Sequence, residues 1–206
     1  EKIDVVALDM GQSPDYSSYF TIVSEEEVGP TIADDLRQSA FLSVLFALIV
    51  IFAYIFIRFR KWQYSLGAVV ALFHDVLIII SVFSLLYGIL PFSLEIDQAF
   101  IAAILTVIGY SLNDTVVVFD RIREFQRTKV GDGKDIVNRA LNSTLSRTVN
   151  TSLTTIVVLL IIFIFGGEVI RGFMFALILG VIVGTYSSLF IATPVMVDTS
   201  KMKKVT

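Results

Sequence analysis

The chain has 206 residues, of which 55% are hydrophobic, and its mean hydropathy is +0.81. Soluble domains are about 45–50% apolar, so this composition argues against a soluble protein. The absence of cysteine excludes disulfides and thiolate metal sites. A net charge of −3 gives no indication of a nucleic-acid partner.

The first 35 residues form a polar, acidic segment. Within it, the runs Ile3–Val6 and Ser18–Val23 predict short strands, which could not close a hydrophobic core by themselves. We therefore expect residues 1–35 to be the C-terminal remnant of an α+β extracytoplasmic domain.

Five stretches have the length and apolar composition of bilayer-spanning helices, which need about 20 residues. They are residues 36–57, 65–87, 99–119, 149–166 and 171–197. The sequence therefore predicts an all-α membrane domain of five transmembrane helices over residues 36–199, followed by a basic tail at 200–206.

The connector at residues 120–147 has apolar residues near helical spacing after Gly131 and Gly133. This pattern predicts an interfacial helix along the cytoplasmic face, with a solvated connector as the alternative. The apolar residues are Ile136, Val137, Ala140, Leu141 and Leu145.

Basic residues are concentrated on one side of the predicted spans. Of the 16 Lys and Arg residues, three follow the first span, seven follow the third and three lie in the tail. Because Lys and Arg stay on the cytoplasmic side, we expect the N-terminal segment outside and the C-terminus inside. An exported N-terminal segment needs a preceding signal, so we expect the chain to be the C-terminal part of a longer protein.

Asp114 lies inside the third span, about five residues before its cytoplasmic end. A charge in the bilayer costs about 2.5–3.5 kcal/mol, and such residues usually mark ion pathways or proton relays. Because burial favours the neutral form of a carboxyl group, Asp114 could bind a proton from one side and lose it to the other. A buried Asp bonded permanently to a neighbouring helix is the alternative.

Arg147 and Thr148 open the fourth span. If the third and fourth helices pack antiparallel, Arg147 lies near Asp114 and favours its charged form. Approach and retreat of Arg147 could then switch the proton affinity of Asp114. The alternative is that Arg147 only anchors the helix at the cytoplasmic surface.

Four other polar residues could support this site. Tyr110 and Asn113 lie close to Asp114, and Asn113 could orient a water molecule or simply bond a neighbouring helix. His74 and Asp75 form a second pair in the second span, and their adjacent positions face different sides of the helix. A helix–helix hydrogen bond and a relay role are equally compatible with this pair.

The fifth span carries small residues at four-residue intervals, which lie along one ridge of a helix. Small ridges let helices approach closely in lipid, so this pattern predicts tight packing, with a sliding surface as the alternative. The ridge residues are Gly172, Ala176, Gly180, Gly184, Ser188 and Ala192.

Several catalytic motifs are absent from the sequence. There is no Gly-rich phosphate loop followed by Lys and no His-Glu-x-x-His metal helix. Asp75 and Asp114 also lack the Tyr-Asp and Gly-x-Gly-Asp contexts of aspartyl intramembrane proteases. We therefore expect no enzymatic activity and no cofactor, with protons as the coupling ion.

Residues 107–124 (VIGYSLNDTVVVFDRIRE) resemble the signature of the SecF family. Shorter matches are VGPT at 28–31, ALFHD at 71–75, LSRT at 145–148 and TSLTT at 151–155, and the resemblance extends over residues 28–197. It implies five of the six helices of one half of a resistance–nodulation–division (RND)-type transporter, in the bacterial inner membrane.

The same resemblance implies a function and partners. A SecF-like chain would work with a SecD half and the SecYEG translocon, using the proton-motive force to assist preprotein export. By the motif match, Asp114 is the proton-carrying acid and Arg147 its basic partner.

Two other functions remain open at this point. The first is an RND-type proton-coupled exporter of lipids or small molecules, recognisable by a substrate-sized cleft in its extracytoplasmic domain. The second is a non-transporting translocon scaffold, in which Asp114→Asn would change neither proton flux nor export.

Overall fold

A computed structural model of the chain describes residues 30–128 and 133–200. Its helices are α1 (Pro30–Phe59), α2 (Trp62–Leu86), α3 (Gln98–Thr128), α4 (Gly133–Phe165), α5 (Glu168–Ser187) and α6 (Thr193–Thr199), and a π-helical segment, η2 (Ser188–Ala192), joins α5 to α6. The described residues contain no strand, and the two expected strands lie outside them.

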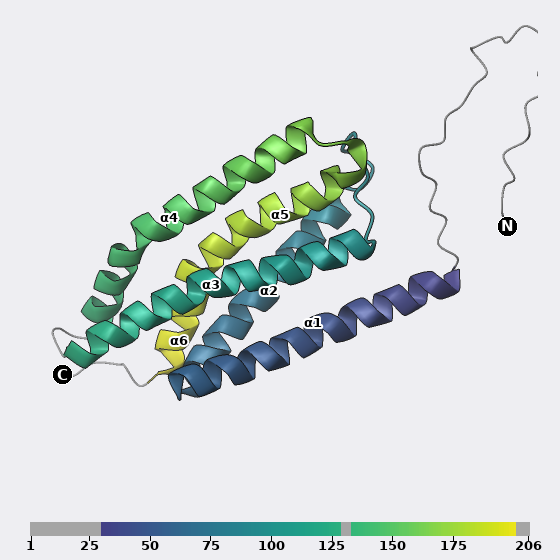
Figure 1. The fold of residues 1–206 in the computed structure, drawn as a ribbon. Coiled ribbons are helices and arrows are strands. Elements are labelled where there is room, and N and C mark those ends of the chain that lie inside the picture. The colour runs from purple at the N-terminus through teal and green to yellow at the C-terminus, as the bar shows by residue number, and fades with distance from the viewer. Residues whose placement is uncertain (1–29, 129–132, 201–206) are drawn as a thin grey trace, which may run out of the picture.

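Among the described residues, five helices are long and apolar enough to cross a membrane, as the sequence predicts. The last of them, Glu168–Thr199, combines α5, η2 and α6. Because the number of spans is odd, the start of α1 and the end of α6 lie at opposite ends of the bundle (Figure 1). The chain is therefore a multi-pass membrane protein.

The core of the bundle is formed by α3 and α5, which pack against each other and against α2 and α4 (Figure 1). Half of the most apolar window of the last span and 44% of that of α3 are buried within the chain, against 6% for α1 and 11% for α4. The outer faces of α1 and α4 are therefore left for lipid or for a partner.

The small residues of α5 and η2 pack closely against neighbouring segments, and two of them, Gly180 and Gly184, meet α3. A Cβ atom added at Gly180 would collide with the Val107 side chain. One added at Gly184 would lie 2.9 Å from the Cβ of Ser111. Gly172 lies against the backbone carbonyl of Ser93, while Ala176, Ser188 and Ala192 are fully buried. The ridge thus brings the two central helices together.

The connector between the third and fourth spans differs from our expectation of a separate interfacial helix. α3 continues to Thr128, and α4 runs from Gly133 to Phe165 as one helix that bends near its start (Figure 1). Val137 and Ala140 of α4 belong to the same buried cluster as Phe119 and Ile122 of α3. The amphipathic pattern therefore reflects packing against the extended end of α3. A helix lying on a membrane surface would require the same spacing of apolar residues, so the sequence does not distinguish the two.

Gly180→Ala tests the α3–α5 contact. The added methyl group meets Val107 and is expected to lower the free energy of unfolding by about 1–3 kcal/mol. Gly109→Ala is the matched control, because no atom lies within 4 Å of its added Cβ. This control should be neutral or should stabilise the helix by up to about 1 kcal/mol. Detergent-induced unfolding measures both variants, and equal effects would contradict tight packing at Gly180.

Candidate functional site

Two aspartates are buried in the centre of the bundle. Asp75 of α2 is fully buried and Asp114 of α3 is 4% exposed. A carboxyl group in such a place is costly unless other polar groups surround it. The two aspartates, Asp114 and Asp75, have different hydrogen-bond partners.

Asp114 faces α4. The Arg147 guanidinium and the Ser152 hydroxyl, both on α4, are the polar groups that act on its carboxyl. Ser152 in turn shares a hydrogen bond of 2.6 Å with the Thr185 hydroxyl of α5. The Oδ2 atom of Asp114 has no hydrogen-bond partner within the described residues. Its carboxyl group is therefore only partly satisfied by protein groups.

A stripe of hydroxyl groups on α4 lines this contact. Thr144, Thr148 and Ser152 are buried and lie four residues apart, which places them on one face of the helix. The Thr148 hydroxyl, like Asp114 Oδ2, has no partner among the described residues. Farther along the same two helices, the Tyr110 hydroxyl donates to Thr155 Oγ1 at 3.3 Å. The α3–α4 contact is thus polar over several helical turns.

A polar pocket of about 360 Å³ opens beside Asp114, between α3 and α4. Its lining residue Val117 lies about one helical turn beyond Asp114 on α3. Arg147, which is exposed, lines the same pocket. A proton leaving the carboxyl would therefore have only about one turn to cross before reaching polar surroundings. The lining residues are Val117, Asp120, Arg121, Glu124, Ser143, Thr144 and Arg147.

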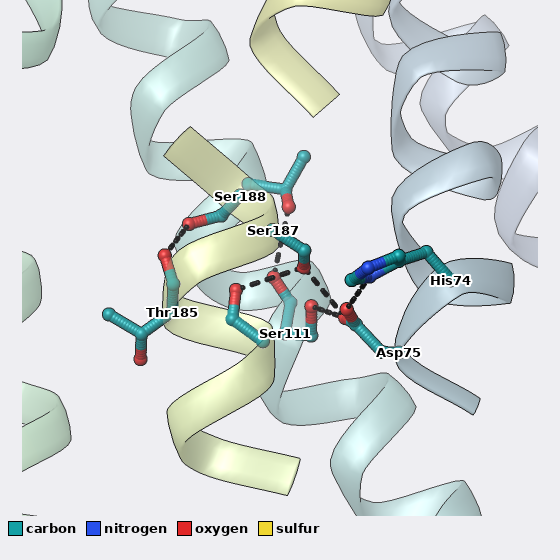
Figure 2. Close-up of polar contacts among 8 residues, drawn as sticks. His74, Asp75, Ser111, Thr185, Ser187 and Ser188 are labelled. Carbon is teal, nitrogen blue, oxygen red and sulfur yellow. Dashed lines mark hydrogen bonds and ion pairs between the residues drawn. The ribbon is translucent and has the colours of Figure 1, made fainter. Parts of the chain in front are cut away.

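Asp75 has a fuller set of partners (Figure 2). Its Oδ2 atom accepts hydrogen bonds from the Ser111 hydroxyl at 2.6 Å and from the Ser187 hydroxyl at 2.8 Å. His74 Nδ1 lies 3.2 Å from the other oxygen, Oδ1. Asp75 therefore ties α2, α3 and α5 together through one side chain.

The side chains of His74 and Asp75 lie close together, although adjacent residues start from different sides of a helix. Asp75 points into the bundle, and the half-buried His74 lies at the edge of the same helix. Its imidazole nevertheless turns back toward the carboxylate (Figure 2). The pair is thus one polar unit, in contrast to the two opposite faces expected from the sequence.

The π-helical segment η2 begins directly after Ser187. The Ser187 hydroxyl also lies 3.2 Å from the carbonyl of Gly184, and the Thr193 hydroxyl donates to the Ser188 carbonyl at 3.1 Å. Inserted π turns are frequent at functional sites. Asp75 is therefore bonded to the residue at which the last span changes its helical geometry.

Asn113 lies apart from this network. It is exposed on α3, on the same face as Ala102, Thr106 and Gly109, which are also exposed. The sequence-predicted residues that the structure brings to the α3–α4 contact are Tyr110, Asp114, Arg147 and Thr148. Asn113 instead belongs to a small and polar face that the described residues do not cover, hereafter the α3 outer stripe.

Four hydroxyl residues of the network were not among the predicted site residues: Ser111, Ser152, Thr185 and Ser187. The four-residue spacing of Thr144, Thr148 and Ser152 is a signal that could have identified Ser152. No comparable pattern singles out Ser187, which is 112 positions from Asp75.

The fold and the site define a multi-pass helical membrane protein with ionisable groups buried at its centre. Residues 12–202 match the family model of the protein export membrane protein SecD/SecF, C-terminal, and the chain belongs to this family.

The relatives agree with this assignment. The chain is 61% identical to the protein translocase subunit SecF of Rhodothermus marinus, over 86% of this chain and 58% of the relative. It is 49% identical to SecF of Cereibacter sphaeroides, over 84% and 51%. A crystal structure of SecDF in the super-membrane-facing form matches with a TM-score of 0.72 and 40% identity, over 83% of this chain and 22% of that one. The chain spans somewhat more than half the length of these SecF relatives.

Ser187→Ala tests whether Asp75 holds the bundle together. Removing one donor from a buried carboxylate is expected to lower the free energy of unfolding by about 1–2 kcal/mol. Ser81→Ala is the control, because the exposed Ser81 hydroxyl bonds only the Leu77 carbonyl of its own helix. The control should stay within about 0.5 kcal/mol of the parent in detergent-induced unfolding. If Ser187→Ala lowers the free energy of unfolding no more than Ser81→Ala does, the hydrogen bond from Ser187 to Asp75 does not hold the bundle together.

Proposed function

We propose that this chain is the membrane part of a SecF-type subunit, or half of a fused SecDF, that couples the proton-motive force to Sec-dependent preprotein translocation. It acts as a component of a transport machine rather than as an enzyme. Its membership of the SecD/SecF family and its SecF relatives support the export role. The proton coupling rests on the Asp114 site.

The observation that carries the proposal is the burial of the Asp114 carboxyl group beside the polar contact between α3 and α4. Asp114 is 4% exposed and its Oδ2 atom has no hydrogen-bond partner within the described residues, while Arg147 lines the pocket about one helical turn away. A proton can bind at this carboxyl group, and a change in the α3–α4 contact would change the polar groups that face it. Each proton that crosses the full potential releases about 2.3 kcal/mol per 100 mV, which the machine can convert into movement.

Asp75 serves a different purpose in this scheme. Both oxygens of its carboxyl group already have polar partners, namely two hydroxyl donors and a nearby imidazole. A proton on Oδ2 would displace one of the two serine donors. Asp75 therefore holds α2, α3 and α5 in register through these hydrogen bonds, while α4 changes its contact with Asp114.

The orientation follows from the charge at the two ends of the bundle. The end that contains the α1–α2 turn and the α3–α4 connection carries Arg60, Lys61 and Arg127 among other basic residues. The opposite end carries Glu95, Asp97 and Glu168. By the positive-inside rule, the first end is cytoplasmic and the start of α1 faces the periplasm of a bacterial inner membrane.

The partners of the chain include a SecD half, the SecYEG translocon and the preprotein. One relative of known structure is a SecDF, which supports a SecD half as the immediate neighbour. The α3 outer stripe is the surface best suited to it, because small residues allow close helix packing and Asn113 offers a hydrogen bond across the contact.

Asp114→Asn is expected to abolish gradient-dependent preprotein export while leaving the complex assembled. Asparagine keeps the size and polarity of the side chain but cannot release a proton. The assay is export into sealed vesicles with and without a proton gradient. Asp198→Asn is the control, because Asp198 is exposed and does not line the pocket between α3 and α4. Export that still responds to the gradient in Asp114→Asn would disprove the relay.

Arg147→Ala is expected to impair the same gradient-dependent step, since the cation that favours the charged carboxyl is gone. Arg139→Ala, two helical turns away on α4, is the control because Arg139 stacks on Phe125 instead. Both variants are assayed in the same vesicles. Equal export from the two variants would reduce Arg147 to an anchor at the membrane surface.

A further inference from the structure

A second pocket lies at the same end of the bundle, between the α1–α2 turn and the end of α3. Its volume is about 350 Å³. Four of the residues that line it are cationic and none is acidic: Phe59, Arg60, Lys61, Tyr64, Arg123, Gln126 and Arg127. We refer to it as the basic pocket. It shares no residue with the pocket beside Asp114.

The acidic residues nearest to the basic pocket on α3 are engaged elsewhere. Asp120 pairs with Arg58 at 2.9 Å, and Glu124 pairs with Arg121 at 2.7 Å. Within the described part of the chain, Arg60, Lys61 and Arg127 form no ion pair. The positive charge of the pocket is therefore not balanced by ion pairs among the residues that the structure describes.

The walls of the pocket are fixed. Phe59 and Tyr64 are buried and stack with their ring centroids 5.0 Å apart, and the Tyr64 hydroxyl donates to Gln126 Oε1 at 3.3 Å. Arg123 donates to the Arg58 carbonyl at 3.2 Å. Arg60 has a φ of +58°, a left-handed conformation that is uncommon for a residue with a side chain. The turn therefore places Arg60 in the wall at a conformational cost.

The start of α2 adds donors to this site. Lys61 is the N-cap of α2 and makes no capping hydrogen bond with its side chain. The first N–H groups of a helix lack intrahelical partners, and its dipole favours a negative charge there. The four cationic side chains of the pocket thus favour an anion with several acceptor oxygens, and the dipole of α2 adds to this preference.

The position of the pocket in the membrane identifies the source of that anion. Phe59 ends the first span and Trp62, half exposed, begins the second, so the pocket lies at the level of the lipid headgroups. Beside it, α1 exposes Ile57 and Phe56. We propose that the basic pocket binds the phosphodiester of an anionic phospholipid, whose acyl chains lie along the exposed apolar face of α1.

The test uses the full-length protein in phosphatidylcholine nanodiscs to which phosphatidylglycerol is added, with native mass spectrometry of the lipid that stays bound. The double variant Arg60→Asn, Lys61→Gln removes two of the four charges, and asparagine tolerates the left-handed backbone. Each basic residue near an anionic membrane surface contributes about fivefold to binding, so the double variant should bind phosphatidylglycerol roughly thirtyfold more weakly.

The matched control is Lys134→Gln, Arg139→Gln, which removes two charges from the same end of the bundle but outside the pocket. It should bind phosphatidylglycerol as the parent does. An equal loss in both double variants would overturn the proposal, since binding would then follow the total charge of this end. If the pocket double variant does not fold, Lys61→Gln alone should lose about fivefold, with Lys134→Gln unchanged.

Two further measurements distinguish the ligand. Phosphatidylcholine retained as tightly as phosphatidylglycerol would contradict a site for anionic headgroups. Glycerol 1-phosphate is added as a competitor without acyl chains. Failure of equimolar glycerol 1-phosphate to displace phosphatidylglycerol supports a lipid site, whereas full displacement would assign the pocket to a free phosphate and overturn the proposal.

Discussion

A polar group inside a bilayer must find its partners within the protein, and the structure depends on how two buried carboxyl groups meet this requirement. Asp75 meets it with fixed donors, since Ser111 and Ser187 come from two other helices and His74 lies beside it. Asp114 meets it only in part, with Arg147 and Ser152 on one side and an unpartnered oxygen on the other. The first acid is bonded to three helices, and the second is the one that we propose as the proton carrier.

The two acids lie at different faces of the helix α3. Toward α5 it meets Gly180 and Gly184, and the close approach at Gly184 brings Ser111 to Asp75. Toward α4 it meets hydroxyl groups and the polar pocket that contains Arg147. Tight apolar packing resists small displacements, whereas a polar contact can exchange partners. The face of α3 toward α5 is therefore the closely packed one, and the face toward α4 is the polar one.

Much of this was predictable from the sequence, for reasons that can be named. Hydropathy revealed the five spans because the bilayer sets their length, and Asp114 stood out because a charge within an apolar run is rare. The network around Asp75 was not predictable, since serine and threonine in membrane helices commonly bond their own helix, as Ser81 and Thr106 do here. The continuity of α4 was also missed, because packing against α3 and lying on a membrane surface demand the same amphipathic spacing. The sequence of Ser188–Ala192 contains no pattern that predicts a π-helical segment.

Protonation of Asp114 can be observed directly by infrared difference spectroscopy of the full-length protein in membranes, between acidic and alkaline conditions, with isotope-labelled aspartate to identify carboxyl bands. A carboxyl band that appears on acidification, is absent in Asp114→Asn and persists in Asp75→Asn is the predicted result. A band that survives in Asp114→Asn, or a carboxyl group of Asp114 that never changes its charge, would contradict the assignment of this residue as the proton carrier.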